Sequence, residues 1–369
     1  MEDKICFITF YPQCHNPGLM KDVGQIPNTL GNNYKNIDTK LVSCILNMED
    51  ENIKNLTGVK IEKIPFVLKN DFITGIKYIW KNAKKVDWFN FYHGGRKVYY
   101  WTRFYKFLKP SGKVYLKMDL SYEGCKKYSG SKKELAIFEK TAKAVDIISV
   151  ESEAIKEIVS KFSQADIKKI CNGYFDTKKL VIKKTSERQN EFITVGRLGT
   201  PQKASDLLLE AFYKSSEKHN WNLRLVGSID ESFIEYKNSF FEKHPDMKSR
   251  VIFEGSITDK EKLYELYNSA KVFVLPSRWE GFPLVGPEAS HCGCRMILTD
   301  IIPPIKELTA DQKYGVSIKT NDVDALVDAL VEEANRSTDE NEPIYISEYA
   351  KDNLSWDGIC SRLVEYMGM

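Results

Sequence analysis

The sequence predicts an α/β protein with two doubly wound, Rossmann-like domains that face each other across a cleft. Short apolar runs of β-type residues alternate with helical stretches along the whole chain. Strands separated by helices of this length form parallel sheets. The alternation stops at a charged, polar stretch, TKKLVIKKTSERQN, and then starts again. A chain of 369 residues also favours two domains over one.

In the first half, the runs that predict strands are apolar and rich in β-branched and aromatic residues. They lie at residues 4–10, 39–46, 59–66, 86–93, 113–120, 145–152 and 167–173. We expect the helices of this half at residues 71–85, 96–109, 131–144 and 153–162. This half therefore predicts one parallel sheet covered by helices.

The second half repeats the pattern, with helices in most of the gaps between strands. Its strands are expected at residues 191–198, 223–229, 250–257, 271–277, 294–300 and 315–319, and its first helix at 204–219. We therefore place the first domain at residues 1–173, a linker at 174–190 and the second domain at 191–352. A helix within residues 353–369 is expected to pack back towards the first domain.

Composition excludes several classes of protein. The hydrophobic content of 42% argues against disorder, and no apolar run approaches the roughly 20 residues that span a bilayer. The eight cysteines form no C-x-x-C pair, which favours reduced thiols over disulfides or zinc. The apolar block near the start ends at a Tyr-Pro pair and reads as a first strand, not a signal peptide. We therefore expect a cytoplasmic protein.

The charge is distributed unevenly along the chain. Residues 1–170 hold 29 Lys and Arg against 19 Asp and Glu, whereas the remainder holds 25 against 32. A basic half joined to an acidic half indicates a different partner for each. No nucleic-acid recognition motif accompanies the positive charge, so nucleic acid is not an expected partner. No dinucleotide or P-loop fingerprint follows a strand either.

The stretch SRWEGFPLVGPEASHCG is the most informative part of the chain. Glu280 and Glu288 lie on either side of a Gly-Pro turn, and we expect Pro283 to be the first residue of a helix, where a missing N–H costs nothing. The amides of residues 281–284 would then be free to hold an anion. This order fits a diphosphate with a hydroxyl-rich group at each end, as in a nucleotide-sugar. The alternative is two solvated acids at a helix start.

A second stretch, GRLGTPQKASDLLLEAF, predicts a phosphate site. Arg197 and Lys203 flank a Gly/Pro loop that enters a helix. Charge-assisted hydrogen bonds to phosphate contribute about 1.5–3 kcal/mol each. The alternative is that both are ordinary surface cations.

Together these segments resemble the family-4 retaining glycosyltransferases with the GT-B fold. The glutamates are similar to the family's E-x7-E pair, and Gly-Arg-Leu followed by Lys203 is similar to its G-R-L…K segment. NGYFDTKK (172–179), LVGSID (225–230), the turn at Gly255 and NLSWDGI (353–359) follow in the family's order. The resemblance covers most of residues 167–369.

The resemblance implies a role for each matching residue. Glu280 would contact the hydroxyls of the donor sugar, Glu288 would bind the ribose, and Arg197 and Lys203 would hold the phosphates. The remaining donor-binding residues would be Gly255 and Ile257 at the nucleobase, and Gly281, Phe282, Pro283 and Leu284 at the diphosphate.

The implied reaction is displacement at the anomeric carbon with retention. The expected donor is a nucleotide-sugar, with UDP as its nucleotide, and the acceptor is a glycan or a lipid-linked glycan in surface polysaccharide or glycoconjugate assembly. No cofactor or metal is expected, because lysine and arginine would stabilise the departing diphosphate.

The first half supplies three further candidates on the acceptor side. Gly18 resembles the family's glycine turn beside the donor phosphate, although the usual Gly-Gly is absent. His93 ends a strand and precedes two glycines, so its imidazole is expected to line the cleft. Asp119 stands at the end of the following strand, where family members often carry a histidine. This departure leaves the acid/base assignment between His93 and Asp119 open.

Residues 96–109 predict a basic amphipathic helix. Its apolar face carries Val98, Trp101, Tyr105 and Leu108, and the opposite arc carries Arg96, Arg103, Lys106 and Lys109. The simpler interpretation is a helix that packs on the sheet. The alternative is attachment to an anionic membrane, peripheral on its inner face, where each nearby cation adds about 1 kcal/mol.

Two rival functions remain at this point. A nucleotide-sugar epimerase on the same architecture would need a different set of acids. A non-catalytic GT-B protein that binds sugar or a partner transferase would not need both glutamates and both cations.

Overall fold

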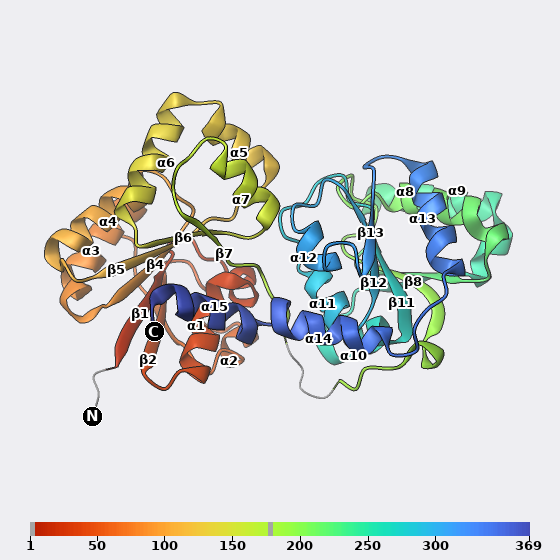
Figure 1. The fold of residues 1–369 in the computed structure, drawn as a ribbon, viewed down its shortest axis with the longest axis horizontal. Helices are drawn as coiled ribbons and strands as arrows, with labels where there is room; N and C mark the ends of the chain where they lie inside the picture. The colour runs from red at the N-terminus through yellow and green to blue at the C-terminus, as the bar shows by residue number, and fades with distance from the viewer. Residues whose placement is uncertain (1–3, 176–179) are drawn as a thin grey trace. The chain divides into compact units, whose positions relative to one another are not determined.

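The computed structural model describes residues 4–175 and 180–369. The chain divides into two compact units (Figure 1). The first unit comprises Met1–Gly173 together with Trp356–Met369, and the second comprises Tyr174–Ser355. Residues 176–179 lie outside the described residues, and they include part of the expected linker and of the NGYFDTKK segment.

The first unit contains a parallel sheet of seven strands in the order β3-β2-β1-β4-β5-β6-β7. The strands are β1 (Ile5–Phe10), β2 (Ile37–Ser43), β3 (Lys60–Lys63), β4 (Trp88–Tyr92), β5 (Lys113–Lys117), β6 (Ile147–Val150) and β7 (Ile167–Lys169). The helices are α1 (Asp22–Asn33), α2 (Glu51–Lys54), α3 (Asp71–Asn82), α4 (Arg96–Leu108), α5 (Tyr122–Ser129), α6 (Lys132–Ala144), α7 (Glu153–Ser160) and α15 (Trp356–Met367).

Helices cover both faces of this first sheet. One face packs on α3, α4, α5, α6 and α7 through a core that includes Phe89, Phe91, Trp101 and Tyr105. The other face packs on α1 through a second core that includes Leu19, Val23 and Leu41. The final helix also belongs to this unit, because Asn33 Nδ2 donates to Asp357 Oδ1 over 2.7 Å and the Cys360 thiol lies 3.7 Å from the Ile26 carbonyl oxygen.

The second unit contains a parallel sheet of six strands in the order β10-β9-β8-β11-β12-β13. The strands are β8 (Gln189–Val195), β9 (Asn222–Val226), β10 (Val251–Gly255), β11 (Ala270–Leu275), β12 (Arg295–Thr299) and β13 (Gly315–Ile318). The helices are α8 (Ser205–Ser215), α9 (Ile234–Lys243), α10 (Lys260–Ser269), α11 (Val285–His291), α12 (Ile305–Thr309), α13 (Val323–Asn335) and α14 (Glu342–Leu354). Apolar cores lie on both faces of the sheet.

The prediction of two doubly wound parallel sheets is confirmed, with all thirteen expected strands present at shifted ends. Each sheet has one point where the strand order reverses. This switch point lies between β1 and β4 in the first unit and between β8 and β11 in the second. Ligands on open α/β sheets bind beyond the carboxyl ends of the strands at such a point.

Several details differ from the sequence-based expectations. The segment after β1 contains a short 3₁₀ helix, Asn16–Met20, and the start of α1, neither of which was expected. The helix α5 was not expected either. Residues 180–190 pack on the second unit. In particular, the buried Arg188 donates to the carbonyl oxygens of Ala270 and Cys292. Within the described ranges, no helix combines the length and apolar character needed to cross a bilayer.

Candidate functional site

The switch point of the second unit brings together two of the predicted charged residues. Lys203 follows β8, and Glu280 follows β11. Lys203 Nζ lies 2.6 Å from Glu280 Oε1, and their side chains are 16% and 8% exposed. Ser277 Oγ donates to the same carboxylate oxygen over 2.8 Å, and Gln202 Nε2 donates to the other oxygen over 3.3 Å. Two loops far apart in sequence therefore hold one carboxylate in a fixed orientation.

Glycines keep the neighbouring strand ends open. The aliphatic part of Lys203 passes over Gly196, where an added Cβ would lie 3.1 Å from Lys203 Cε. Gly227 has a φ of 139°, and a Cβ there would lie 1.8 Å from the Gly196 carbonyl oxygen. Gly255 has a φ of 74° and open space where its Cβ would be, and its carbonyl accepts from the Gly227 N–H. Bare backbone therefore lines the ends of β8, β9 and β10.

Arg197 does not join the Lys203–Glu280 pair. Its side chain is exposed, and among the described residues none forms a hydrogen bond or ion pair with its guanidinium. Its charge contributes to the lowered pKa of Asp230, after the larger effect of the hydrogen bonds from Ser232. The structure thus places Arg197 at the same strand end as Lys203 but leaves its charge open to solvent.

The loop at residues 281–284 differs from the expectation. α11 begins at Val285, so Pro283 lies before the helix and the prediction that it is the first helical residue is wrong. Pro287 instead takes the third helical position, where its missing N–H also costs nothing because the first four N–H groups have no partner within a helix. The amides of Gly281, Phe282 and Leu284 donate no hydrogen bond to another described residue. Ile257 and Phe282 are partly buried against the core.

Glu288 lies in α11 and is 6% exposed. It forms an ion pair with Lys260, the first residue of α10. Burial raises the pKa of the Glu288 carboxyl, and the nearby Lys260 ammonium opposes that rise in pKa. Each glutamate of the predicted pair is therefore neutralised by its own lysine.

The switch point of the first unit holds a cavity of about 460 Å³. Tyr11 follows β1 and His93 follows β4, and both line the cavity, with their rings 5.5 Å apart in an edge-to-face arrangement. Arg96 and Trp101 of α4 line it as well. His93 has a φ of 52°, a strained value for a residue other than glycine. The expected position of His93 at a strand end is therefore observed, together with a hollow beside it.

Two other candidates of the first unit lie outside this cavity lining. Gly18 belongs to the 3₁₀ helix Asn16–Met20 and has no left-handed φ, so its backbone does not require glycine. Asp119 is exposed and lies beside Glu151. Burial, followed by the charges of Asp119 and Asp22, raises the pKa of Glu151 to about 8 against the opposing effect of Lys117.

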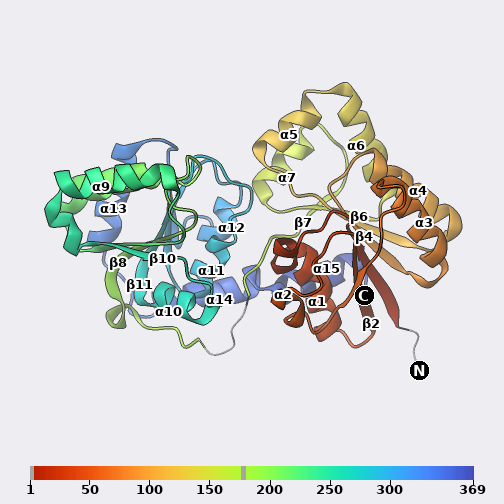
Figure 2. The same cartoon turned by 180° about the vertical axis from the view of Figure 1, so that it is seen from behind.

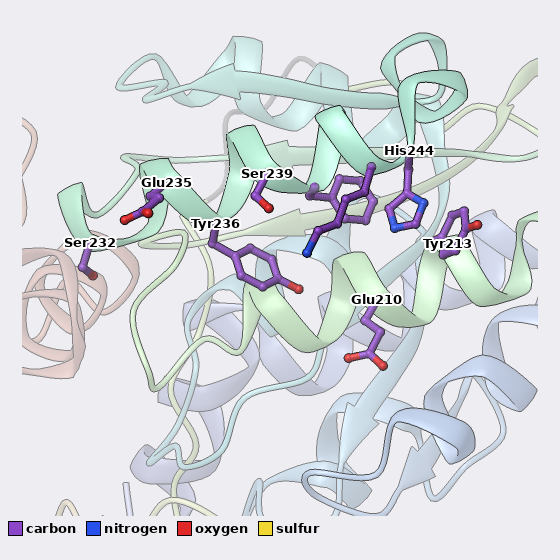
Figure 3. A pocket seen from close by; sticks show the side chains of 9 residues that line it. Glu210, Tyr213, Ser232, Glu235, Tyr236, Ser239 and His244 are labelled. Atoms are coloured by element: carbon purple, nitrogen blue, oxygen red, sulfur yellow. The ribbon is translucent and has the colours of Figure 1, made fainter.

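A further hollow in the second unit contains none of the predicted site residues (Figure 3). It lies between α8 and α9, has a volume of about 460 Å³ and is lined by residues that include Glu210, Tyr213, Tyr236 and His244. Nor do the described parts of the chain contain a group of three or more His, Cys, Asp or Glu side chains that could hold a metal ion.

Comparison with known proteins assigns the part of the chain that carries the Lys203–Glu280 pair. Residues 176–352 match the family of glycosyl transferases group 1. An uncharacterized glycosyltransferase of Haemophilus influenzae is 31% identical over 149 residues, which cover 40% of each chain. The amylovoran biosynthesis glycosyltransferase AmsD of Erwinia amylovora is 29% identical over 138 residues, or 37% of each chain. The matched segments therefore span about two fifths of the length of these relatives.

A solved structure extends the likeness to both units. The Anabaena protein HepE in complex with UDP has a TM-score of 0.71 at 14% identity, with 99% of each chain covered. The likeness shows that the chain has the GT-B fold. The family match itself is to glycosyl transferases group 1 and covers residues 176–352.

Sequence reasoning missed four residues of these sites. Ser277 and Gln202 orient Glu280, Lys260 neutralises Glu288, and Tyr11 faces His93. Tyr11 and Ser277 could have been found from their places at the carboxyl ends of predicted strands, because Tyr11 follows the strand at 4–10 and Ser277 is the last residue of the strand at 271–277. Lys260 carried no such signal, because one lysine at a helix start is common.

Proposed function

We propose that the chain is a retaining glycosyltransferase that moves a sugar from a nucleotide-sugar to a glycan or lipid-linked acceptor. The observation that carries this proposal is the Lys203–Glu280 pair at the switch point of the second sheet, within the segment that matches group 1 glycosyl transferases. A cation and a carboxylate held in contact at this edge suit a ligand with a phosphate next to a polyhydroxyl ring.

In this proposal the donor spans the second unit from Glu280 to Glu288. The sugar hydroxyls donate to Glu280, which Ser277 and Gln202 hold in orientation. The ribose hydroxyls donate to Glu288. The diphosphate lies beside the amides of residues 281–284 and the charges of Arg197 and Lys203, and the bare backbone at Gly255 leaves room for the base.

The chemical step breaks the bond between the anomeric carbon and the diphosphate oxygen, and the electron pair leaves with the diphosphate. The acceptor hydroxyl forms the new bond on the same face, and its proton passes to the departing diphosphate oxygen. Negative charge grows on the departing oxygens, so Lys203 and Arg197 lower the barrier by interacting more strongly with the transition state than with the bound donor. No metal ion is part of this proposal.

The cavity beside His93 is the proposed acceptor site. It lies at the switch point of the first sheet, and its lining includes an imidazole, a guanidinium and several aromatic rings. Asp119 does not line it, which favours His93 over Asp119 as the group next to the acceptor hydroxyl.

Relatives support the donor and acceptor classes. HepE was crystallised with UDP and with UDP-glucose, so a UDP-sugar is the first donor to test. AmsD is named for amylovoran biosynthesis, which supports a surface polysaccharide or glycoconjugate as the product.

A thermal-shift screen of UDP-, GDP-, ADP- and dTDP-sugars tests donor binding. A ligand at about 100 times its Kd stabilises the native state by about 2.7 kcal/mol and raises the Tm. Transfer is then measured with the donor that binds. Arg197→Ala and Lys203→Ala are each expected to lower kcat more than about tenfold, because each removes a cation from the leaving group. Lys248→Ala, at an exposed lysine of the same unit, is the control.

Wild-type turnover in both variants would remove these cations from the mechanism. Tight donor binding without hydrolysis or transfer would instead favour the non-catalytic alternative.

A further inference from the structure

The outer surface of α3 and α4 is unusually basic and carries exposed aromatic rings. Residues 71–109 contain nine Lys and Arg against two Asp. Both aspartates are already paired, Asp71 with Lys97 and Asp87 with Lys109. Within residues 71–109, most of the positive charge therefore has no acidic partner.

The two helices lie side by side on the same face of the first sheet, as both views show (Figures 1 and 2). The Phe72 and Tyr100 rings are 6.2 Å apart, and Trp101 Nε1 donates to the Phe72 carbonyl oxygen over 3.0 Å. An added Cβ at Gly75 would lie 2.3 Å from the Trp101 indole. The outward stripes of α3 and α4 therefore form one continuous surface.

The apolar face predicted for residues 96–109 packs on the sheet, as the simpler interpretation expects. Val98, Trp101 and Tyr105 of α4 are at most 4% exposed and pack in the core. Lys106 and Lys109 pair with Asp146 and Asp87. The apolar face predicted from the sequence is thus the core face, and two of the four predicted cations are occupied.

The exposed stripes have a different composition. On α4 the stripe is Arg96, Tyr100, Arg103 and Phe107, and on α3 it is Ile73, Lys77, Trp80 and Lys81. Phe107 is 79% exposed, Trp80 66% and Tyr100 53%. Among the described residues, none forms an ion pair with Lys77, Lys81, Arg96 or Arg103. Exposed apolar side chains, three of them aromatic, alternate with the cations along both stripes.

We propose that this α3–α4 surface binds the anionic surface of a lipid bilayer. Its unpaired cations match the negative potential of anionic headgroups, and tryptophan, tyrosine and phenylalanine rings insert at the level of the headgroups. A folded protein fits this surface less well as a partner. It would need a groove that accommodates the exposed tryptophan and phenylalanine side chains and the positive charges around them. The first turns of the same helices line the cavity beside His93, so bilayer contact at this surface would bring headgroup-linked acceptors to the rim of that cavity.

Sedimentation with vesicles tests the proposal on the full chain. We expect the protein to pellet with phosphatidylcholine vesicles that contain about one third phosphatidylglycerol, to stay in solution with pure phosphatidylcholine, and to be released at about 0.5 M salt. The double variants Trp80→Ser/Phe107→Ser and Lys77→Glu/Arg103→Glu should each lower the partition coefficient at least about tenfold. All four side chains are exposed, so unchanged melting curves will show that the fold is retained.

The control variant Tyr345→Ser/Lys351→Glu alters an exposed aromatic residue and an exposed lysine of α14 and should bind like the wild type. Tryptophan fluorescence gives an independent readout, because Trp80 and Trp279 are the exposed tryptophans among the described residues. The vesicle-induced blue shift should disappear in Trp80→Phe and persist in Trp279→Phe.

Failure of the wild type to bind anionic vesicles at low salt would overturn the proposal. So would double variants that both bind as tightly as the wild type, or a control variant whose partition coefficient falls as much as theirs. Donor binding by the second unit is measured separately and does not depend on these outcomes, so each proposal can fail without the other.

Discussion

Glu280 and Glu288 each interact with a lysine, but the two ion pairs have different environments. Lys203 and Glu280 are both largely enclosed, whereas Lys260 is 37% exposed beside a buried Glu288. In the first pair, three donors share the carboxylate oxygens. In the second, burial favours the protonated Glu288 carboxyl, and the Lys260 charge opposes this effect. Under the proposed function, the second pair makes donor binding sensitive to pH.

Replacing Lys260 with methionine should make donor binding fail at a higher pH. Burial already raises the pKa of Glu288, and removal of the Lys260 charge raises that pKa further. A protonated carboxyl accepts fewer ribose hydroxyl donors, so donor affinity is present above the pKa of Glu288 and is lost as the pH falls through it. Over a series of falling pH values, the Kd of Lys260→Met should therefore begin to rise at a higher pH than that of the wild type.

Titration calorimetry of the donor across this pH series measures the effect. Lys262→Met removes an exposed lysine of the same helix and should keep the wild-type pH profile. Parallel profiles in wild type and Lys260→Met would show that Lys260 does not control the ionisation of Glu288.

Single residues also show what the sequence could and could not predict. Glu280 and Lys203 were found because each follows a predicted strand within a segment that resembles a known family. Their direct contact, across 77 residues of sequence, follows from the adjacency of β8 and β11 and not from either segment alone. The partners Ser277 and Gln202 depend on loop conformations that local patterns do not specify.

At the scale of elements, strands were easier to predict than helices. Buried parallel strands are continuous apolar runs, which stand out in this chain. α1 was missed because DVGQIPNTLGNN holds two glycines and a proline, all of which disfavour helix. The structure explains the glycines by close packing, since a Cβ at Gly24 would lie 2.1 Å from the Leu19 carbonyl oxygen and one at Gly31 would lie 1.8 Å from that of Gly58. Tertiary contacts therefore override local propensity.

The junction between α8 and β9 predicts a loss of stability in mild acid. His219 Nδ1 accepts the Trp221 N–H over 3.2 Å, and Nε2 lies 3.0 Å from Ser215 Oγ. The Arg250 guanidinium lies 3.3 Å from Nδ1. A proton on Nδ1 would point at the Trp221 N–H and at the positively charged Arg250 guanidinium. Burial, followed by the charge of Arg250, accordingly lowers the pKa of His219 to about 4.

Because the unfolded chain binds this proton near pH 6.5, the neutral histidine stabilises the fold fully above that pH. The stability contribution is lost as the pH falls from about 6.5 to about 4. Melting curves at several pH values should therefore show that the melting temperature falls less with decreasing pH in His219→Asn than in the wild type. His244→Asn, outside this hydrogen-bond network, should keep the wild-type slope. An unchanged slope in His219→Asn would contradict the prediction.

At the scale of the whole molecule, the chain ends in the unit where it began. Residues 356–369 belong to the first unit although the second unit precedes them in sequence. Ile359, Cys360 and Leu363 of α15 are fully buried, and α15 contacts α1 through Cys360 and Asp357. The stability of the first unit therefore depends on a segment more than 180 residues away from the end of its own sheet.

This arrangement predicts which unit responds to a mutation near the carboxyl terminus. Leu363→Ala removes a fully buried leucine and should cost about 2–5 kcal/mol. Amide hydrogen exchange should then accelerate in α1 and β2, while β8 and β11 keep wild-type protection. Leu330→Ala, at a fully buried leucine of α13, provides the matched control and should reverse the pattern. If Leu363→Ala loosened the strands of the second unit as much as α1, the two units would unfold as one cooperative block, and the final helix would stabilise the whole chain instead of the first unit alone.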